Sequence, residues 1–286
     1  MTQASFVKSV DTTDALFEKE QRLRGHIRDI GKVIVAFSGG VDSSYLAVIA
    51  NQEIGANARC VLGVSPSVSQ HQRQHALDFA SEHGLNLQVV ETSELENPAY
   101  VANNPDRCFH CKSELYSVMA LILSEGDVIL DGTNADDLRD FRPGRKAAAE
   151  KGVESPLAEL GFAKDDIREL SRRLGLSTWD VPSSPCLSSR IAHGTSATPE
   201  RLRMVEIAES YLRTLGFREF RVRAHEDLAR IEISKDEFEK FLDSGILESV
   251  AGNLKGAGFR YVTLDLEGFR SGSMNPIEKK LFNIER

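Results

Sequence analysis

The sequence predicts an α/β protein built on a doubly wound parallel sheet, with a smaller α+β domain after it. Three observations lead to this prediction. Short β-branched and apolar runs alternate with helical patterns between residues 32 and 130, as in parallel sheets whose strands are joined by helices. A glycine-rich turn follows the first of these strands. A loop rich in proline and serine, at 181–190, then separates this region from a segment with its own strands and helices.

The first strand is expected at 32–37, where Val-Ile-Val-Ala is typical of a buried parallel strand. A helix at 14–29 precedes it, and a loop that includes 103–111 interrupts the later alternation. The other elements of this half are helices at 45–54, 70–83, 112–124 and 164–174, and strands at 59–64, 87–91 and 127–130.

The C-terminal part begins with a helix at 198–215, because Thr198 is a good N-cap and Pro199 suits a first-turn position. Strands are expected at 220–223, 229–233 and 261–266, and helices at 236–242 and 247–254. We therefore predict two domains, 1–185 and 186–286, the second being a small unit for substrate binding or oligomerisation.

The composition is that of an ordinary soluble protein. Of 286 residues, 41% are hydrophobic, and 35 Lys and Arg against 43 Asp and Glu give a net charge of −8. Phosphate backbones are bound by clustered basic residues, so we expect no nucleic-acid partner. No apolar run is long enough to cross a membrane, and residues 1–21 lack the apolar core of a signal peptide. We expect a cytoplasmic homo-oligomer with no membrane partner.

The turn at 38–43, Ser-Gly-Gly-Val-Asp-Ser, has the properties of a phosphate-binding loop. Consecutive backbone N–H groups in a glycine-rich turn form an anion site, and the following helix N-terminus adds partial positive charge. The loop that transfers a γ-phosphate needs a lysine after its glycines, and none follows here.

This hexad, placed directly after Val-Ile-Val-Ala-Phe, resembles the signature of the PP-loop ATP pyrophosphatase superfamily, whose fold is adenine-nucleotide α-hydrolase-like. The resemblance implies that ATP is cleaved between its α- and β-phosphates and that Asp42 is catalytic and holds Mg²⁺. The residues it assigns to ATP binding are Ser38, Gly39, Gly40, Asp42, Ser43, Ser44, Gly132, Thr133 and Asn134.

Three of the four cysteines lie outside the expected core. Cys108 and Cys111 form a C-x2-C pair, Cys186 lies far along the chain, and Cys60 sits in an apolar strand as a small core residue. By itself the pair is compatible with half a zinc site, a dithiol redox pair, ligands of an iron–sulfur cluster, or two structural thiols.

The segments Arg107-Cys-Phe-His-Cys-Lys112 and Pro185-Cys-Leu-Ser-Ser-Arg190, together with 265–273, resemble the LarE-type sulfur transferases that make the nickel-pincer nucleotide cofactor. The resemblance implies that a pyridinium carboxylate mononucleotide is adenylylated and converted to a thiocarboxylate. Two sulfur routes exist in that family. In one, Cys186 is catalytic and gives up its own sulfur; in the other, Cys108, Cys111 and Cys186 hold a [4Fe-4S] cluster. Because all three cysteines are present, the cluster route is the favoured hypothesis.

The substrate phosphate is expected to bind Ser189 and Arg190, beside the third cysteine, and Arg221 and Arg223, which alternation places on one face of a strand. For Arg107 and Arg190 the alternative is solvated surface charge. Further candidates for a metal site are Glu209 and Glu232.

Three other functions are compatible with parts of this sequence. A tRNA thiolase also combines this loop with cysteines but needs a basic RNA-binding surface. An ammonia-dependent synthetase leaves the cysteine pair without a role. A nucleotide-sensing module binds ATP without releasing pyrophosphate.

Overall fold

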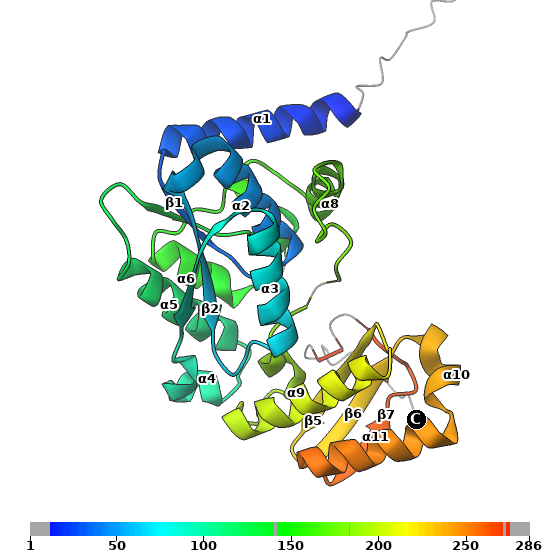
Figure 1. Cartoon of the computed structure of the whole chain (residues 1–286). Coiled ribbons are helices and arrows are strands. Elements are labelled where there is room, and N and C mark those ends of the chain that lie inside the picture. The colour runs from blue at the N-terminus through cyan, green and yellow to red at the C-terminus, as the bar shows by residue number, and fades with distance from the viewer. Residues whose placement is uncertain (1–11, 140–141, 183, 271–272, 275–286) are drawn as a thin grey trace, which may run out of the picture. The chain divides into compact units, whose positions relative to one another are not determined.

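A computed structural model describes residues 12–139, 142–182, 184–270 and 273–274. The chain forms two compact units (Figure 1). The first contains the described residues up to Ser65 together with Gln70–Glu94 and Cys108–Ser184. The second contains Pro66–Ser69, Leu95–Arg107 and the described residues from Pro185 onward.

The first unit is built on a four-stranded sheet in the order β3-β2-β1-β4, in which every neighbouring pair is parallel. Its strands are β1 (Val33–Ala36), β2 (Ala58–Val64), β3 (Asn86–Glu91) and β4 (Val128–Leu130). The parallel sheet predicted from the alternating pattern is confirmed.

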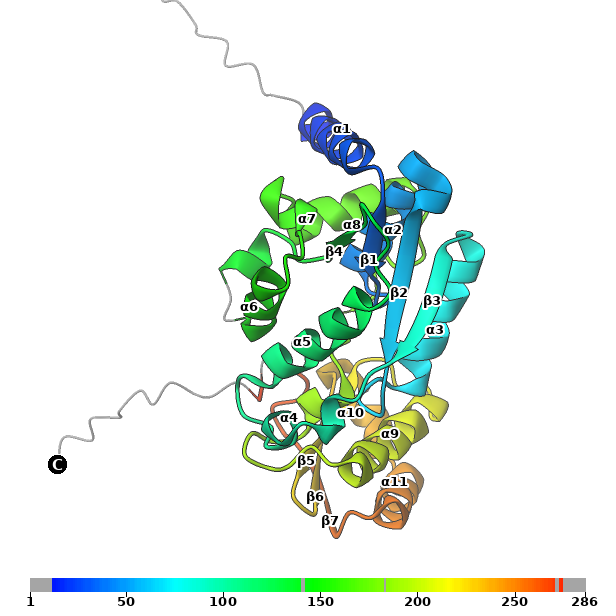
Figure 2. The same ribbon diagram turned by 90° about the vertical axis from the view of Figure 1, so that its left-hand side faces the viewer.

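Helices cover both faces of this sheet, because alternate strand residues enter two different cores (Figure 2). Val33 and Val35 pack with one set of helices, whereas Ile34 between them packs with the other. The first set is α1 (Thr12–Ile30), α2 (Val41–Ile54), α3 (Gln70–Glu82) and α8 (Lys164–Arg173); the second is α5 (Arg107–Ala120) and α6 (Pro143–Glu150). The sheet is therefore doubly wound, as the sequence predicts.

Shorter elements lie between the longer ones along the chain. They are α4 (Pro98–Val101), α7 (Pro156–Glu159), and the 3-10 turns η1 (Gly55–Asn57), η2 (Glu94–Glu96), η3 (Asp136–Leu138) and η4 (Leu187–Arg190). Two of them, α4 and η4, belong to the second unit.

The second unit is an α+β unit with a three-stranded mixed sheet in the order β5-β6-β7. β5 (Phe220–His225) and β6 (Leu228–Ile233) are antiparallel, and β7 (Tyr261–Leu264) pairs parallel to β6. Its helical elements are α9 (Pro199–Thr214), η5 (Lys235–Glu237), α10 (Phe238–Phe241) and α11 (Ser244–Ala257). Thr198 caps α9 by accepting from Arg201 N at 3.3 Å, and Pro199 is its first residue.

Two early segments of the chain belong to this second unit through backbone hydrogen bonds. Leu187 N donates to Ser67 O at 2.8 Å, and Ala197 N donates to Val101 O at 2.8 Å. The compact units are therefore not continuous in sequence. The division at residues 185/186 remains our proposal for where the second folding domain begins.

The predicted loop at 103–111 is wrong in its second half, because α5 already begins at Arg107. Phe109 packs against the core that also contains Tyr116, so the apolar side of the helix starts before Lys112. Similarly, α2 begins at Val41, four residues before the predicted start. Asp42 and Cys108 therefore lie in the first turns of helices.

Candidate active site

The phosphate-loop turn lies between β1 and α2, and its backbone requires glycine. Gly39 has φ +73°, in the left-handed region, and a Cβ there would lie 2.8 Å from Cβ of Ala76. Gly40 is the N-cap of α2, with no side-chain cap. The turn thus brings its backbone against α3, and α2 begins without a side-chain cap from its N-cap residue, which suits an anion site.

The two hydroxyls of the turn face each other. Ser38 Oγ and Ser43 Oγ are 3.0 Å apart, and Ser43 Oγ also donates to Gly40 O at 3.2 Å. Ser38 is exposed, whereas Ser44 is fully buried, with no hydrogen-bond partner for its hydroxyl in the described part of the chain. Contact of ATP with Ser38, Ser43 or Ser44 therefore remains a prediction.

The residues after β4 lie against this turn. β1 and β4 are parallel neighbours, so both end at the same sheet edge. A Cβ on Gly132 would lie 2.8 Å from Ser43 N, so only glycine allows this approach. Asn134 Oδ1 accepts from Asp136 N and Asp137 N at 3.0 and 3.1 Å, which shapes the next turn. In the strand order, β2 lies on one side of β1 and β4 lies on the other. The strand order therefore reverses at β1, and open α/β sheets bind ligands at such a switch point.

Asp131 organises the end of β4. It is 2% exposed, and it accepts from Thr133 N (3.0 Å), Thr133 Oγ1 (2.9 Å) and Ser155 Oγ (2.8 Å). It also accepts from Tyr116 OH at 2.9 Å and pairs with Lys112 Nζ at 3.0 Å. Burial alone would raise the pKa of Asp131, but the Lys112 charge and these hydrogen bonds outweigh it and lower the pKa below its ordinary value.

Asp42 lies in the first turn of α2, two residues after Gly40. Its Oδ2 forms an ion pair with Lys164 Nζ, and its buried Oδ1 has no hydrogen-bond partner among the described residues. A buried carboxylate oxygen without a donor suits a divalent cation, which accepts hard oxygen ligands. Asp42 therefore fits the predicted Mg²⁺ role.

The cysteines occupy different units. Cys108, exposed, and Cys111, half-buried, lie one turn apart on α5 in the first unit, while Cys186, half-buried, precedes η4 in the second. Across the part of the chain that the structure describes, no group of three or more His, Cys, Asp and Glu side chains could hold a metal ion. The iron–sulfur hypothesis therefore rests on the sequence alone. Cys60 is buried in β2, as predicted, and burial raises the pKa of its thiol to about 12.

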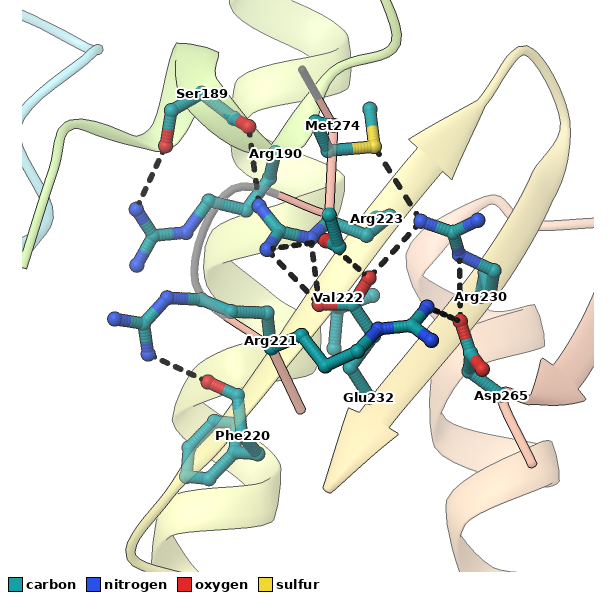
Figure 3. A network of polar contacts seen from close by, with 12 residues as sticks. Ser189, Arg190, Phe220, Arg221, Val222, Arg223, Arg230, Glu232, Asp265 and Met274 are labelled. Atoms are coloured by element: carbon teal, nitrogen blue, oxygen red, sulfur yellow. Dashed lines mark hydrogen bonds and ion pairs between the residues drawn. The ribbon is translucent and has the colours of Figure 1, made fainter. Parts of the chain in front are cut away.

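The predicted substrate-binding arginines lie close together in the second unit, each engaged by a neighbour (Figure 3). Arg190 is 3% exposed and pairs with Glu209, from Nε to Oε1 at 3.0 Å and from Nη2 to Oε2 at 3.3 Å. Its Nη1 donates to Ser189 Oγ at 3.0 Å. The alternative of solvated surface charge is therefore wrong for Arg190.

Glu232 is the second buried carboxylate of this cluster, with no exposed surface. Its Oε2 accepts from Arg223 Nε at 3.0 Å and its Oε1 from Arg230 Nη2 at 2.9 Å, while Arg223 Nη1 donates to Ser189 O at 3.2 Å (Figure 3).

Arg221 donates to Phe220 O at 2.6 Å. Burial, and then the charge of Arg190, lower the pKa of Arg221 to about 10. Bound phosphate would offset both effects.

Arg107 is also buried, with 6% of its surface exposed, so it is not solvated surface charge either. Its Nη1 donates to Ser188 O at 2.7 Å and to Asn103 Oδ1. Asn103 Nδ2 donates to the carbonyls of Ile191 (3.1 Å), Ala192 (2.9 Å) and Thr195 (3.0 Å). These bonds fix the backbone of the residues that follow Cys186.

Comparisons with known proteins show the family of this chain. A family model described as NAD synthase matches residues 18–107, which include the phosphate loop. An uncharacterized protein from Synechocystis is 42% identical over 267 residues, 93% of this chain and 100% of that protein. Pyridinium-3,5-bisthiocarboxylic acid mononucleotide synthase from Lactiplantibacillus plantarum is 38% identical over 263 residues, 91% of this chain and 95% of the synthase. The chain belongs to the LarE-type branch of the PP-loop family.

An archaeal relative is also similar over most of its length. This uncharacterized protein from Methanocaldococcus jannaschii is 31% identical over 242 residues, 84% of this chain and 91% of that protein. In the LarE-type chain described here, no helix of the described residues is long and apolar enough to cross a membrane. Part of the predicted signature at 265–273, Ser271 and Gly272, lies outside the described residues.

Sequence reasoning missed Asp131 as an organising residue and Lys164 as the partner of Asp42. The signal for Asp131 was its position at the end of a strand, before a glycine. No pattern in the sequence pairs Lys164 with Asp42, because 122 positions separate them.

Proposed function

We propose that this enzyme uses ATP to adenylylate the carboxylates of a pyridinium mononucleotide and then replaces a carboxylate oxygen with sulfur. The observation that carries the proposal is that a chain 38% identical to a bisthiocarboxylic acid mononucleotide synthase has both a glycine-rich turn at the sheet switch point of one unit and a buried arginine cluster within the other. The turn suits pyrophosphate, and the cluster suits a substrate phosphate.

In the first step a carboxylate oxygen attacks the α-phosphorus of ATP. The bond between the α-phosphorus and the oxygen that bridges it to the β-phosphate breaks, and pyrophosphate leaves with that oxygen. The backbone N–H groups at 38–43 and the start of α2 would stabilise the charge that develops on pyrophosphate. Asp42 would hold Mg²⁺, which supplies further charge neutralisation. Gly132 allows the β4 edge to approach the same turn.

In the second step an anionic sulfur attacks the acyl carbon and AMP leaves. In one route Cys186 bears the sulfur: its thiolate forms a thioester with the acyl group, and the Cβ–Sγ bond then breaks by β-elimination, which leaves the thiocarboxylate and dehydroalanine. In the favoured route Cys108, Cys111 and Cys186 would instead be the ligands of a [4Fe-4S] cluster. Their thiolates are suitable iron ligands, and a bound cluster would supply a transferable sulfide. Arg107 and Asn103 support this role by holding the backbone after Cys186.

The substrate phosphate is proposed to bind beside Arg221 and Arg223, with Ser189 and Arg190 completing the site. Guanidinium groups hold phosphate oxygens through paired hydrogen bonds. Glu209 and Glu232 are already bonded to arginines, so their role here is to orient those arginines. They are not needed as metal ligands.

The test is product analysis with the pyridinium mononucleotide, ATP, Mg²⁺ and a sulfide source under anaerobic conditions. We expect AMP, pyrophosphate and a product in which sulfur has replaced oxygen, detected by mass spectrometry. Formation of ADP and phosphate, or unchanged substrate carboxylates, would reject the proposal.

The proposal includes a homo-oligomeric, cytoplasmic enzyme without a nucleic-acid partner, as expected from the sequence. Sedimentation velocity tests the oligomeric state. A salt-sensitive shift of tRNA on a native gel would instead favour the tRNA thiolase alternative.

A further inference from the structure

We propose that Lys164 is an internal counter-ion that neutralises Asp42 when no nucleotide is bound, and that it is displaced from this carboxylate when Mg²⁺ binds there with ATP. This inference rests on the proposed function only for the identity of the nucleotide. The exchange itself concerns Lys164, Asp42 and a divalent cation.

The geometry places the ammonium where a metal would compete with it. Lys164 Nζ donates to Asp42 Oδ2, and Asp42 is its hydrogen-bond acceptor among the described residues. The other oxygen, Oδ1, is buried without a partner in that part of the chain. A carboxylate that holds an ammonium on one oxygen and a divalent cation on the other brings two like charges within a few ångströms. The two cations therefore compete for Asp42.

The backbone of Lys164 is fixed, although its side chain is able to leave. Lys164 N donates to Asp136 Oδ2 at 2.8 Å, and Ala163 N donates to Asp166 Oδ2 at 3.1 Å. Lys19 Nζ pairs with Asp166 at 2.6 Å and donates to Gly161 O at 2.9 Å. These contacts hold the start of α8 in place independently of Asp42.

The side chain itself is 32% exposed, so its pairing with Asp42 is a partly solvated contact. Contacts of this kind are weak enough to be exchanged during a catalytic cycle. Once displaced, the ammonium stays tethered to the start of α8, beside the phosphate loop. It then adds positive charge next to the polyphosphate instead of next to the carboxylate.

The experiment measures Mn²⁺ binding to the nucleotide-free protein by electron paramagnetic resonance, at constant ionic strength. Lys164→Ala should bind Mn²⁺ about two- to five-fold more tightly than the natural chain, as expected from the loss of one partly exposed competing ion pair. Asp42→Asn should abolish this binding in either background, which assigns the site.

Lys19→Ala is the matched control, because it removes an ion pair at the same end of α8 without touching Asp42. Its Mn²⁺ affinity should equal that of the natural chain. Unchanged or weaker Mn²⁺ binding by Lys164→Ala would overturn the proposal, and Lys164→Gln provides the same test if the alanine variant unfolds. Mn²⁺ binding is measured without turnover. Formation of ADP in the product analysis would therefore reject the proposed function but leave the Mn²⁺ affinities unchanged.

Discussion

At the scale of single residues, the second unit contains charges that are buried in pairs. Arg190 and Arg223 are 3% and 6% exposed, and Glu209 and Glu232 are 4% and 0% exposed. A buried charge is tolerated only when a partner and hydrogen bonds replace its lost hydration. Each of these groups has such a partner, so contacts within the protein fix the positions of the arginines.

The first prediction concerns Glu232→Ala. It should destabilise the protein by about 3 kcal/mol, because two arginines lose their buried acceptor. The free energy of unfolding is measured by urea denaturation. Glu267→Ala is the control: Glu267 also pairs with an arginine, but its side chain is 71% exposed, so stability should change by less than about 0.5 kcal/mol. Equal effects from the two variants would contradict the buried-pair interpretation.

The second prediction concerns Asp42→Ala. Pyrophosphate release should fall below detection, because the cation loses its carboxylate ligand, while the fold should remain. Asp42 is at the helix start, and its partner Lys164 is 32% exposed, so loss of this ion pair should cost little stability. A coupled pyrophosphate assay and far-ultraviolet circular dichroism measure the two effects. Retained turnover would remove Asp42 from the mechanism.

At the scale of elements, the end of β4 depends on Asp131. This residue connects the strand to α5 through Tyr116 and Lys112, and to the β4 turn through Thr133. The same helix carries Cys108 and Cys111 in its first turns. Asp131 therefore links the end of β4 to the helix that carries the cysteine pair.

The third prediction uses the pKa of Asp131, which is lower in the folded protein than its ordinary value. A carboxylate with a lowered folded pKa stabilises the protein above its unfolded pKa, near pH 4, and this contribution is lost as the pH falls further. Asp131→Asn should therefore lower stability by about 2 kcal/mol at neutral pH. The difference from the natural chain should shrink below about pH 4. Urea midpoints across this pH range test the prediction, and a difference that does not vary with pH would contradict it.

At the scale of the whole molecule, the chain combines two compact units that are interleaved in sequence. Cys108 and Cys111 belong to one unit and Cys186 to the other, so the sulfur chemistry that we propose draws on both. The cysteine variants therefore test a property of the complete chain.

The fourth prediction separates the two sulfur routes. If all three cysteines bind one cluster, each single Cys→Ala change should reduce iron content and multiple-turnover activity together. If Cys186 is sacrificed, only Cys186→Ala should abolish activity. Intact-protein mass spectrometry after turnover should then show Cys186 lighter by the mass of H₂S. Iron and sulfide analysis after anaerobic purification distinguishes these outcomes, and Cys60→Ser in the core serves as the control for purification.

Much of the first unit was predictable because its signals are local. The Val-Ile-Val-Ala strand, the glycine turn and the start of α2 follow one another within 33–44, so strand burial and turn geometry can be read from neighbouring residues. The start of α5 was misplaced because the packing of Phe109 against the second face of the sheet is not visible in the sequence.

By itself, the sequence determined the alternating architecture, the glycine-rich turn after the first strand and the family, since each depends on residue types at short spacing. Only the tertiary structure decided which charges meet. It pairs Lys164 with Asp42 across 122 positions, Arg190 with Glu209 across 19, and Arg223 with Glu232 on the neighbouring strand. The physical reason is that turn and strand preferences act between neighbouring residues, whereas an ion pair forms wherever folding brings two side chains together, at any separation along the chain.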